Sequence, residues 1–233
     1  MKLVDSLDQQ LLLEEILERS KPPLPPSCAG LHWLLATPFR YGPYPHGSRF
    51  RRKDQAEGCF YGSDMPETAI AEQAFFKWLF FAESPDTRIP KNGFDHTAFS
   101  VHFRADQSVD LTLPPFDRDY STWSDPNDYE KCQCFADAAR NCGMDLIRYR
   151  SVRDPHCGMN MALLSPVALI SRYPESFRTW SIFVSIDKVQ AFCEMPKVAL
   201  EFDVVQWAAD SRVASKVGLR PNPPKAGRPL ETN

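Results

Sequence analysis

The residues with the clearest chemical potential lie between positions 47 and 72, where an arginine cluster precedes a helix that carries a lone glutamate. A spacing of three and four residues places Glu72 on one helix face with Thr68, Phe75, Phe76 and Leu79. We expect this face to be buried, and a buried carboxylate needs a partner or a chemical task. The nearest upstream cations are Arg49, Arg51, Arg52 and Lys53. This pattern predicts an anionic ligand held by arginine, with the glutamate directed at the reacting centre.

The elements that position these residues follow from local signals. Asp64 and Glu67 have the spacing of an N-cap residue and its reciprocal partner, so we expect a helix over 65–82 that begins near Met65. The segment 59–63 before it is typical of a short strand. HWLLATPFR, at 32–40, has the composition of a buried strand that ends at Arg40.

The rest of the chain mixes strands and helices without regular alternation. An amphipathic helix is expected over 6–20, ended by KPPLPP, and a second helix over 128–142, ended by Gly143. Further strands are expected at 97–104, 108–113, 144–152 and in four segments after residue 160. This order predicts an α+β fold, a mixed sheet with helices, rather than a doubly wound sheet.

We expect three regions along the chain. Residues 1–30 form a helix and a Pro-rich linker, residues 31–210 a catalytic domain, and residues 211–233 a basic, Pro-rich tail that is disordered or draped over the surface. The stretches 83–96 and 114–130 have the character of insertions into this domain, and the sequence does not indicate where they lie in the fold.

Composition excludes several classes of protein. A net charge of −3 gives no global reason to bind nucleic acid or membrane, and no stretch is apolar for long enough to span a bilayer. We therefore expect a cytoplasmic protein. Seven cysteines without a C-x-x-C pair predict free thiols and no metal site. The acidic segment 117–130 lacks the glycine and final glutamate of a calcium loop, which favours a solvated turn.

Polar residues cluster where predicted strands end. Alone, each has an ordinary explanation: an arginine at the surface, a tyrosine in the core, or a serine in a turn. The joint pattern carries more weight, and it comprises Arg40, Tyr41, Arg49, Tyr61, Glu72 and Ser151.

This pattern resembles the RES domain family, named after its Arg, Glu and Ser. The matching elements are TPFR ending at Arg40, GSRF around Arg49, FYGSDMPETAIAE ending at Glu72, and RYRSVR around Ser151. The Tyr-(any ten)-Glu element from Tyr61 to Glu72 is the most specific of them. The resemblance covers residues from about 31 to about 205 and leaves out the N-terminal helix and the basic tail.

The resemblance implies a fold similar to that of ADP-ribosyltransferases, with a cleft for NAD⁺. Characterised RES proteins are toxins of bacterial toxin–antitoxin pairs, and they cleave the nicotinamide–ribose bond with water or inorganic phosphate as acceptor. Their partner is a helix-turn-helix antitoxin that covers the active site. No direct contact with nucleic acid or membrane is implied, and association into a homodimer is left open.

The chemistry of that bond suggests catalytic roles. Cleavage passes through an oxocarbenium-like state, which a carboxylate stabilises, and we assign this role to Glu72. Arginine forks suit the pyrophosphate of NAD⁺, so Arg40 and Arg49 are the candidates, and one of them could receive an acceptor phosphate instead. Ser151 is expected to hydrogen-bond the ribose or the carboxamide.

Three further residues are expected to line the cleft. Tyr61 is expected to stack on the nicotinamide or pack against its ribose, with Tyr41 and Asn160 as further binding residues. Two alternatives remain open at this stage: transfer of ADP-ribose to a macromolecule, and a RES-like module that only binds a partner.

Overall fold

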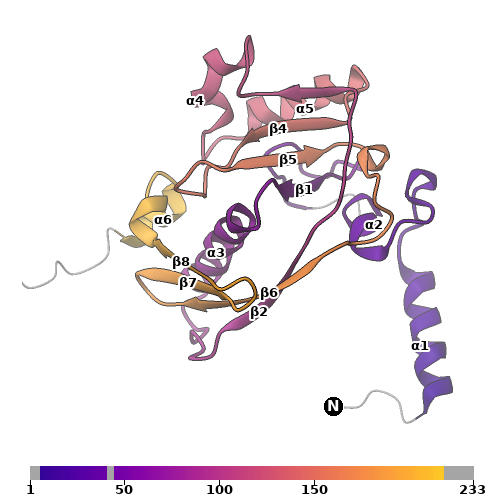
Figure 1. Cartoon of the computed structure of the whole chain (residues 1–233), viewed down its shortest axis with the longest axis horizontal. Helices are drawn as coiled ribbons and strands as arrows, with labels where there is room; N and C mark the ends of the chain where they lie inside the picture. Colours follow the sequence, from indigo (N-terminus) through magenta and orange to yellow (C-terminus); the bar gives the residue numbers. More distant parts are fainter. Residues whose placement is uncertain (1–5, 41–44, 218–233) are drawn as a thin grey trace, which may run out of the picture. The chain divides into compact units, whose positions relative to one another are not determined.

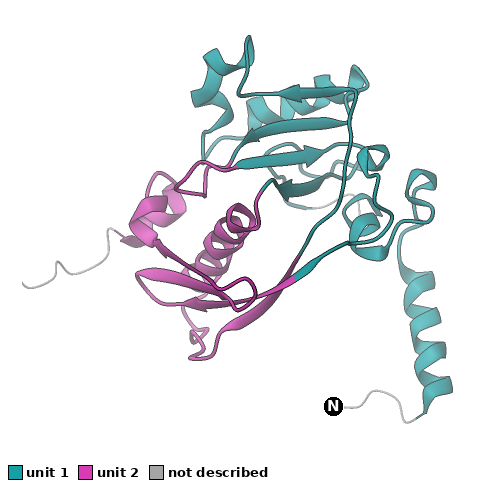
Figure 2. Cartoon of the chain, in the orientation of Figure 1, with its two compact units in different colours: residues 1–64, 99–150, 159–177 teal, residues 65–98, 151–158, 178–233 magenta. Residues whose placement is uncertain are grey.

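A computed structural model describes residues 6–40 and 45–217. The chain forms two compact units (Figure 2). The first unit comprises residues 1–64, 99–150 and 159–177, and the second comprises residues 65–98, 151–158 and 178–233. Each unit has its own four-stranded sheet (Figure 1). The described residues thus form an α+β fold, as expected.

The sheet of the first unit has the order β1-β5-β4-β3. β5 pairs antiparallel with both β1 and β4, whereas β3 and β4 are parallel. Its strands are β1 (Phe60–Ser63), β3 (Ser108–Asp110), β4 (Leu146–Arg150) and β5 (Met159–Leu163).

Both faces of this sheet are covered. Successive residues of a strand point to opposite faces, so two neighbouring residues show what packs on each. Leu146 joins a buried cluster with Leu35 on α2 (Trp33–Arg40). The next residue, Ile147, joins a separate cluster with Ala136 on α5 (Glu130–Asn141). The sheet therefore lies between two helices.

The N-terminal part of the first unit begins with α1 (Leu7–Ser20), whose N-cap residue Ser6 accepts a hydrogen bond from the Gln9 amide at 3.2 Å. A 3-10 turn, η1 (Pro26–Cys28), follows the Pro-rich linker. The remaining elements of this unit are short: η2 (Phe116–Asp119), α4 (Tyr120–Trp123) and η3 (Pro166–Ala168).

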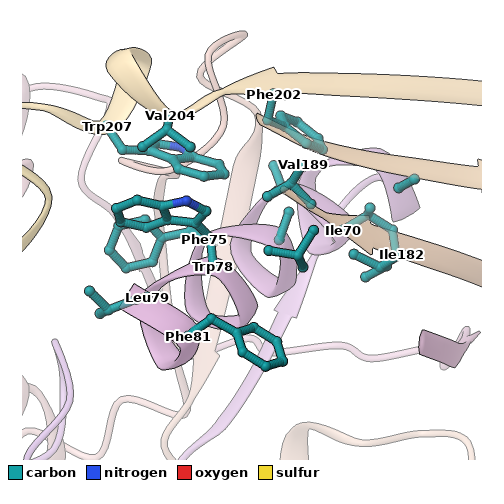
Figure 3. Close-up of a cluster of buried hydrophobic side chains, with 14 of the residues drawn as sticks. Ile70, Phe75, Trp78, Leu79, Phe81, Ile182, Val189, Phe202, Val204 and Trp207 are labelled. Carbon is teal, nitrogen blue, oxygen red and sulfur yellow. The ribbon is translucent and has the colours of Figure 1, made fainter. Parts of the chain in front are cut away.

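The second unit is built on helix α3 (Pro66–Glu83) and a sheet of order β2-β6-β7-β8. Figure 3 shows its core, where α3 contributes Phe75 and Trp78, and Trp207 lies with its ring edge-on to Phe75. The other elements are β2 (Phe94–Phe99), β6 (Phe177–Val184), β7 (Lys188–Cys193), β8 (Val198–Asp203), η4 (Val204–Trp207) and α6 (Ser211–Val217).

The prediction of a strand over 32–40 is wrong, because this segment is helix α2. Its buried residues Leu35, Ala36 and Phe39 have the three-to-four spacing of one helix face. A short apolar run is ambiguous between strand and buried helix when only its composition is considered.

Two further expectations need correction. Asp64 does not cap α3, since Met65 holds the N-cap position without a side-chain bond and the Asp64 carboxylate pairs with Arg148 at 2.5 Å. Residues 211–217 are not a disordered tail but helix α6, whose Val213 is buried. The rest of the predicted tail lies outside the described residues.

The end of α5 agrees with the sequence. Gly143 follows α5 with a positive φ of 73°, which glycine adopts without strain. All seven cysteines are unbridged. Within 6–40 and 45–217, no helix is long and apolar enough to cross a membrane. In the same residues, no three His, Cys, Asp or Glu side chains are grouped so that they could hold a metal ion.

Candidate functional site

Glu72 lies in the middle of α3 and is half-buried. The hydroxyl of Ser151 donates a hydrogen bond of 2.7 Å to its Oε1 atom. The neighbours on its helix face are buried as predicted, except Phe76, which is 52% exposed. Glu72 therefore lies at the border of the apolar face, where a carboxylate can be held by the protein and still reach a ligand.

Ser151 follows the last residue of β4 and is 1% exposed. Its Oγ atom accepts hydrogen bonds from the backbone N–H groups of Arg153, at 3.1 Å, and Asp154, at 3.0 Å. With both amides donating to Oγ, the hydroxyl hydrogen is left to point at Glu72. The turn thus fixes the direction in which Ser151 donates.

A loop formed by residues 151–158, the Ser151–Gly158 loop, is closed by its own hydrogen bonds. Ser151 N donates to the Gly158 carbonyl at 2.8 Å. The Asp154 carboxylate accepts from the amides of His156 and Gly158 and from the Thr68 hydroxyl of α3, the last at 2.8 Å. Asp154 therefore ties the loop to α3 one helical turn before Glu72.

A buried ion pair lies behind this loop. Arg153 donates to Asp210 at 2.8 Å, and the two side chains are only 3% and 1% exposed. Burial raises the pKa of Asp210, but hydrogen bonds from Arg212 and the charge of Arg153 outweigh it and hold that pKa below its ordinary value. Asp210 is therefore ionised at neutral pH.

Arg49 belongs to the first unit, at the corner of a tight turn in which Ser48 and Arg51 pair through their backbones. It is 7% exposed, and its Nη1 donates to the Trp123 carbonyl at 2.7 Å. Its guanidinium lies 4.5 Å from the centre of the Tyr129 ring. Among the described residues, its buried Nη2 atom has no hydrogen-bond partner.

Tyr61, on β1, holds that same turn. Its hydroxyl lies 2.8 Å from Ser48 Oγ and accepts from the Phe50 amide at 3.0 Å. The residue is 38% exposed, yet its hydroxyl end is desolvated, and this raises the pKa of Tyr61 well above its ordinary value. The structure thus brings Tyr61 to the turn that carries Arg49, where its hydroxyl is a neutral structural contact.

Asn160, on β5, is buried opposite Ser63, whose hydroxyl donates to its Oδ1 at 2.6 Å. It is also the register partner of Tyr149 on β4. This places it on the central strands of the first sheet, close in register to Tyr61.

Arg40 is the last residue of α2 rather than the end of a strand. Its guanidinium forms an ion pair with Glu18 of α1 at 2.5 Å and donates to the Pro22 carbonyl at 2.7 Å. It therefore anchors the N-terminal helix and linker. Tyr41 lies outside the described residues.

Sequence reasoning missed the residues that support Ser151. They are Arg153, Asp154, Gly158 and Asp210. The dense polar run SVRDPHCG after a predicted strand was a usable signal for the first three. Nothing in the local sequence around Asp210 indicates its partner.

The described residues thus define an α+β protein. Its second unit carries a half-buried helix carboxylate held by Ser151, and its first unit carries the buried Arg49, whose Nη2 atom has no hydrogen-bond partner among those residues. The family model of the RES domain matches residues 24–183. The chain therefore belongs to the RES domain family, which is associated with toxin-like enzymes that act on NAD⁺. No curated protein matches the chain.

Proposed function

We propose that this protein cleaves the nicotinamide–ribose bond of NAD⁺, with water or inorganic phosphate as the acceptor, in a catalytic region spanning residues 31–210. The observation that carries the proposal is the hydrogen bond from Ser151 to Glu72, at 2.7 Å. It gives the carboxylate a fixed orientation on a half-buried helix face, and orientation of a charge before the reaction is what electrostatic catalysis requires.

In this mechanism the carbon–nitrogen bond to the ring breaks, and its electron pair leaves with nicotinamide, which departs as a neutral molecule. The ribose carbon gains positive charge, and Glu72 stabilises it in the manner of carboxylates at glycosidic centres. Water then yields ADP-ribose and a proton, whereas phosphate yields the phosphate ester of ADP-ribose. Ser151 acts by holding Glu72. To hydrogen-bond the ribose or the carboxamide, as the resemblance suggests, its hydroxyl would exchange the Glu72 carboxylate for the substrate, since it has one hydrogen to donate.

Arg49 is our candidate for a phosphate of NAD⁺ or for the acceptor phosphate. A buried donor without a partner is costly, and an anionic oxygen at the Nη2 atom of Arg49 would satisfy it. The neighbouring Nη1 atom is already held by the Trp123 carbonyl, which fixes the plane of the fork. Because the Nη2 atom is buried, the groups that cover it would have to move aside for the anion to reach it.

The other binding residues have smaller proposed roles. Tyr61, whose hydroxyl holds the Arg49 turn, is proposed to stack on the nicotinamide or to pack against its ribose. Asn160 and Tyr41 complete the proposed binding set. For Arg40 to bind pyrophosphate, its guanidinium would exchange the Glu18 carboxylate for phosphate oxygens, since one fork serves both.

The family membership also supports a biological setting. We propose a toxin that acts on cytoplasmic NAD⁺ and is held inactive by a helix-turn-helix antitoxin covering the site. A complex of that kind would leave the free chain as the active form.

The test is to incubate the purified chain with NAD⁺, with and without inorganic phosphate, and to follow nicotinamide release by proton NMR. Free ADP-ribose identifies hydrolysis, and a phosphate-dependent ester identifies phosphorolysis. Mass spectrometry of added cell protein detects ADP-ribose transfer to a macromolecule instead. Absence of nicotinamide release by folded, antitoxin-free protein would contradict the proposal.

A further inference from the structure

The Ser151–Gly158 loop contacts α3 both before and after Glu72 in the helix. Before Glu72 in the helix, Thr68 donates to Asp154. After it, Phe75 lies under the Arg153 guanidinium, 3.9 Å from the ring centre. Thr68 and Phe75 lie four residues before and three residues after Glu72, so they are its neighbours on the same face of the helix. The position of the loop therefore determines where the Ser151 hydroxyl meets the carboxylate.

Arg153 connects this loop to the C-terminal part of the second unit. Its amide donates to Ser151 Oγ at 3.1 Å, and its carbonyl accepts from Trp207 Nε1 at 2.8 Å. Its guanidinium donates to Asp210 at 2.8 Å. Both Trp207 and Asp210 come from the chain after β8, beyond the residues 24–183 that match the family.

Asp210 is held in place from its own side as well. It accepts three hydrogen bonds from Arg212, from the backbone amide at 3.0 Å, from Nε at 3.0 Å and from Nη2 at 2.8 Å. A carboxylate with these donors and the Arg153 fork has one favourable position, because charged bonds in a buried site are strong and directional.

We propose that the C-terminal segment 207–212 is a positioning element for the catalytic centre, with Asp210 and Trp207 setting the Ser151 hydroxyl against Glu72 by way of Arg153. The inference deepens the proposed function and rests on it for its catalytic consequence. The contacts themselves do not depend on which substrate is bound, so the loop can be tested separately.

The first experiment is hydrogen exchange by mass spectrometry on Asp210→Asn and Trp207→Phe, with Glu201→Gln as the matched control. Glu201 pairs with Lys188 in the same unit, but both side chains are about half exposed. We expect amides of the Ser151–Gly158 loop to exchange about 10-fold faster in the two test variants, with β7 and β8 unchanged. Trp207→Phe retains most of the aromatic packing but removes the Nε1 donor to the Arg153 carbonyl. It therefore tests the positioning role even if Asp210→Asn does not fold.

Two exchange results would overturn the inference, whatever the protein does with NAD⁺. One is loop exchange at the wild-type rate in a folded variant. The other is equal acceleration in the loop and in β7 and β8, which would mean that the segment stabilises the unit as a whole. An inactive wild-type protein would refute the proposed function and leave this result standing.

The second experiment measures steady-state NAD⁺ cleavage. Misplacement of Ser151 should lower kcat by about 10- to 100-fold in Asp210→Asn and leave KM within about 2-fold, because Arg49 and Tyr61, the main residues proposed to bind NAD⁺, are unchanged. In a Ser151→Ala background the same change should have little further effect, since residues that act in series are not additive. Additive losses, or a change in KM alone, would refute the positioning role.

Discussion

Replacement of Gly158 by alanine should destabilise the protein strongly, because no space exists for a side chain. A Cβ atom there would lie 2.0 Å from Thr68 Oγ1 and 2.6 Å from Asp154 Oδ2. Thr68 and Asp154 would have to separate, and their hydrogen bond to a charged acceptor contributes about 1.5–3 kcal/mol. Overpacking adds about 1–3 kcal/mol, and the stiffer unfolded chain returns about 0.4–1 kcal/mol.

The expected loss in the free energy of unfolding is therefore about 2–5 kcal/mol. Urea unfolding followed by tryptophan fluorescence measures it, since Trp78, Trp180 and Trp207 all lie in the core of the second unit. The control is Gly62→Ala, whose Cβ would meet only Phe60, at an ordinary 3.6 Å. Adding Thr68→Ala to Gly158→Ala removes the closest atom and should cost less than the two single losses combined.

A loss below about 0.5 kcal/mol in Gly158→Ala would refute this reasoning, because surface substitutions without special contacts fall in that range. Strict additivity of Gly158→Ala with Thr68→Ala would refute it as well. Either result would mean that the loop does not press against α3 as described.

The remaining stability predictions concern Asp210. Asp210→Asn should cost about 3–5 kcal/mol, since it removes the carboxylate charge from a buried ion pair, whereas Glu201→Gln at the exposed pair should cost less than about 1 kcal/mol. Equal costs in urea unfolding would contradict the difference in burial. Because its folded pKa is depressed, Asp210 stabilises the protein above its ordinary pKa of 3.8, and this contribution is lost as the pH falls through the folded value. The stability difference between wild type and Asp210→Asn should therefore shrink on acidification below 3.8, and a difference that stays constant to low pH would count against it.

The sequence predicted helix α3 and the place of Glu72 on it because their signals are local. Helix spacing placed Glu72 beside Thr68 and Phe75, and the polar turn after β4 placed Ser151 at a strand end. Periodicity could not separate helix from strand in the short segment 32–40. The predicted N-cap at Asp64 is also wrong, because the Asp64 carboxylate pairs with Arg148 instead of capping α3.

Partners far apart in the sequence explain what could not be predicted. Arg40 pairs with Glu18 only because the linker brings α1 back to α2. Asp210 reaches Arg153 through the packing of the chain after β8, and a lone aspartate there carries no pattern. Local sequence thus predicted where Glu72 lies, whereas the contacts that support Ser151 beside it emerge only from the tertiary structure.

The most direct test of the central claim compares nicotinamide release by wild type, Glu72→Gln and Glu83→Gln in the same proton NMR assay. Glu83 lies at the exposed end of α3, so its change controls for the loss of a helix carboxylate. We expect Glu72→Gln to remain folded and to lose about 100-fold or more in rate, and Glu83→Gln to match wild type. Nicotinamide release at the wild-type rate by Glu72→Gln would contradict the assignment of the carboxylate.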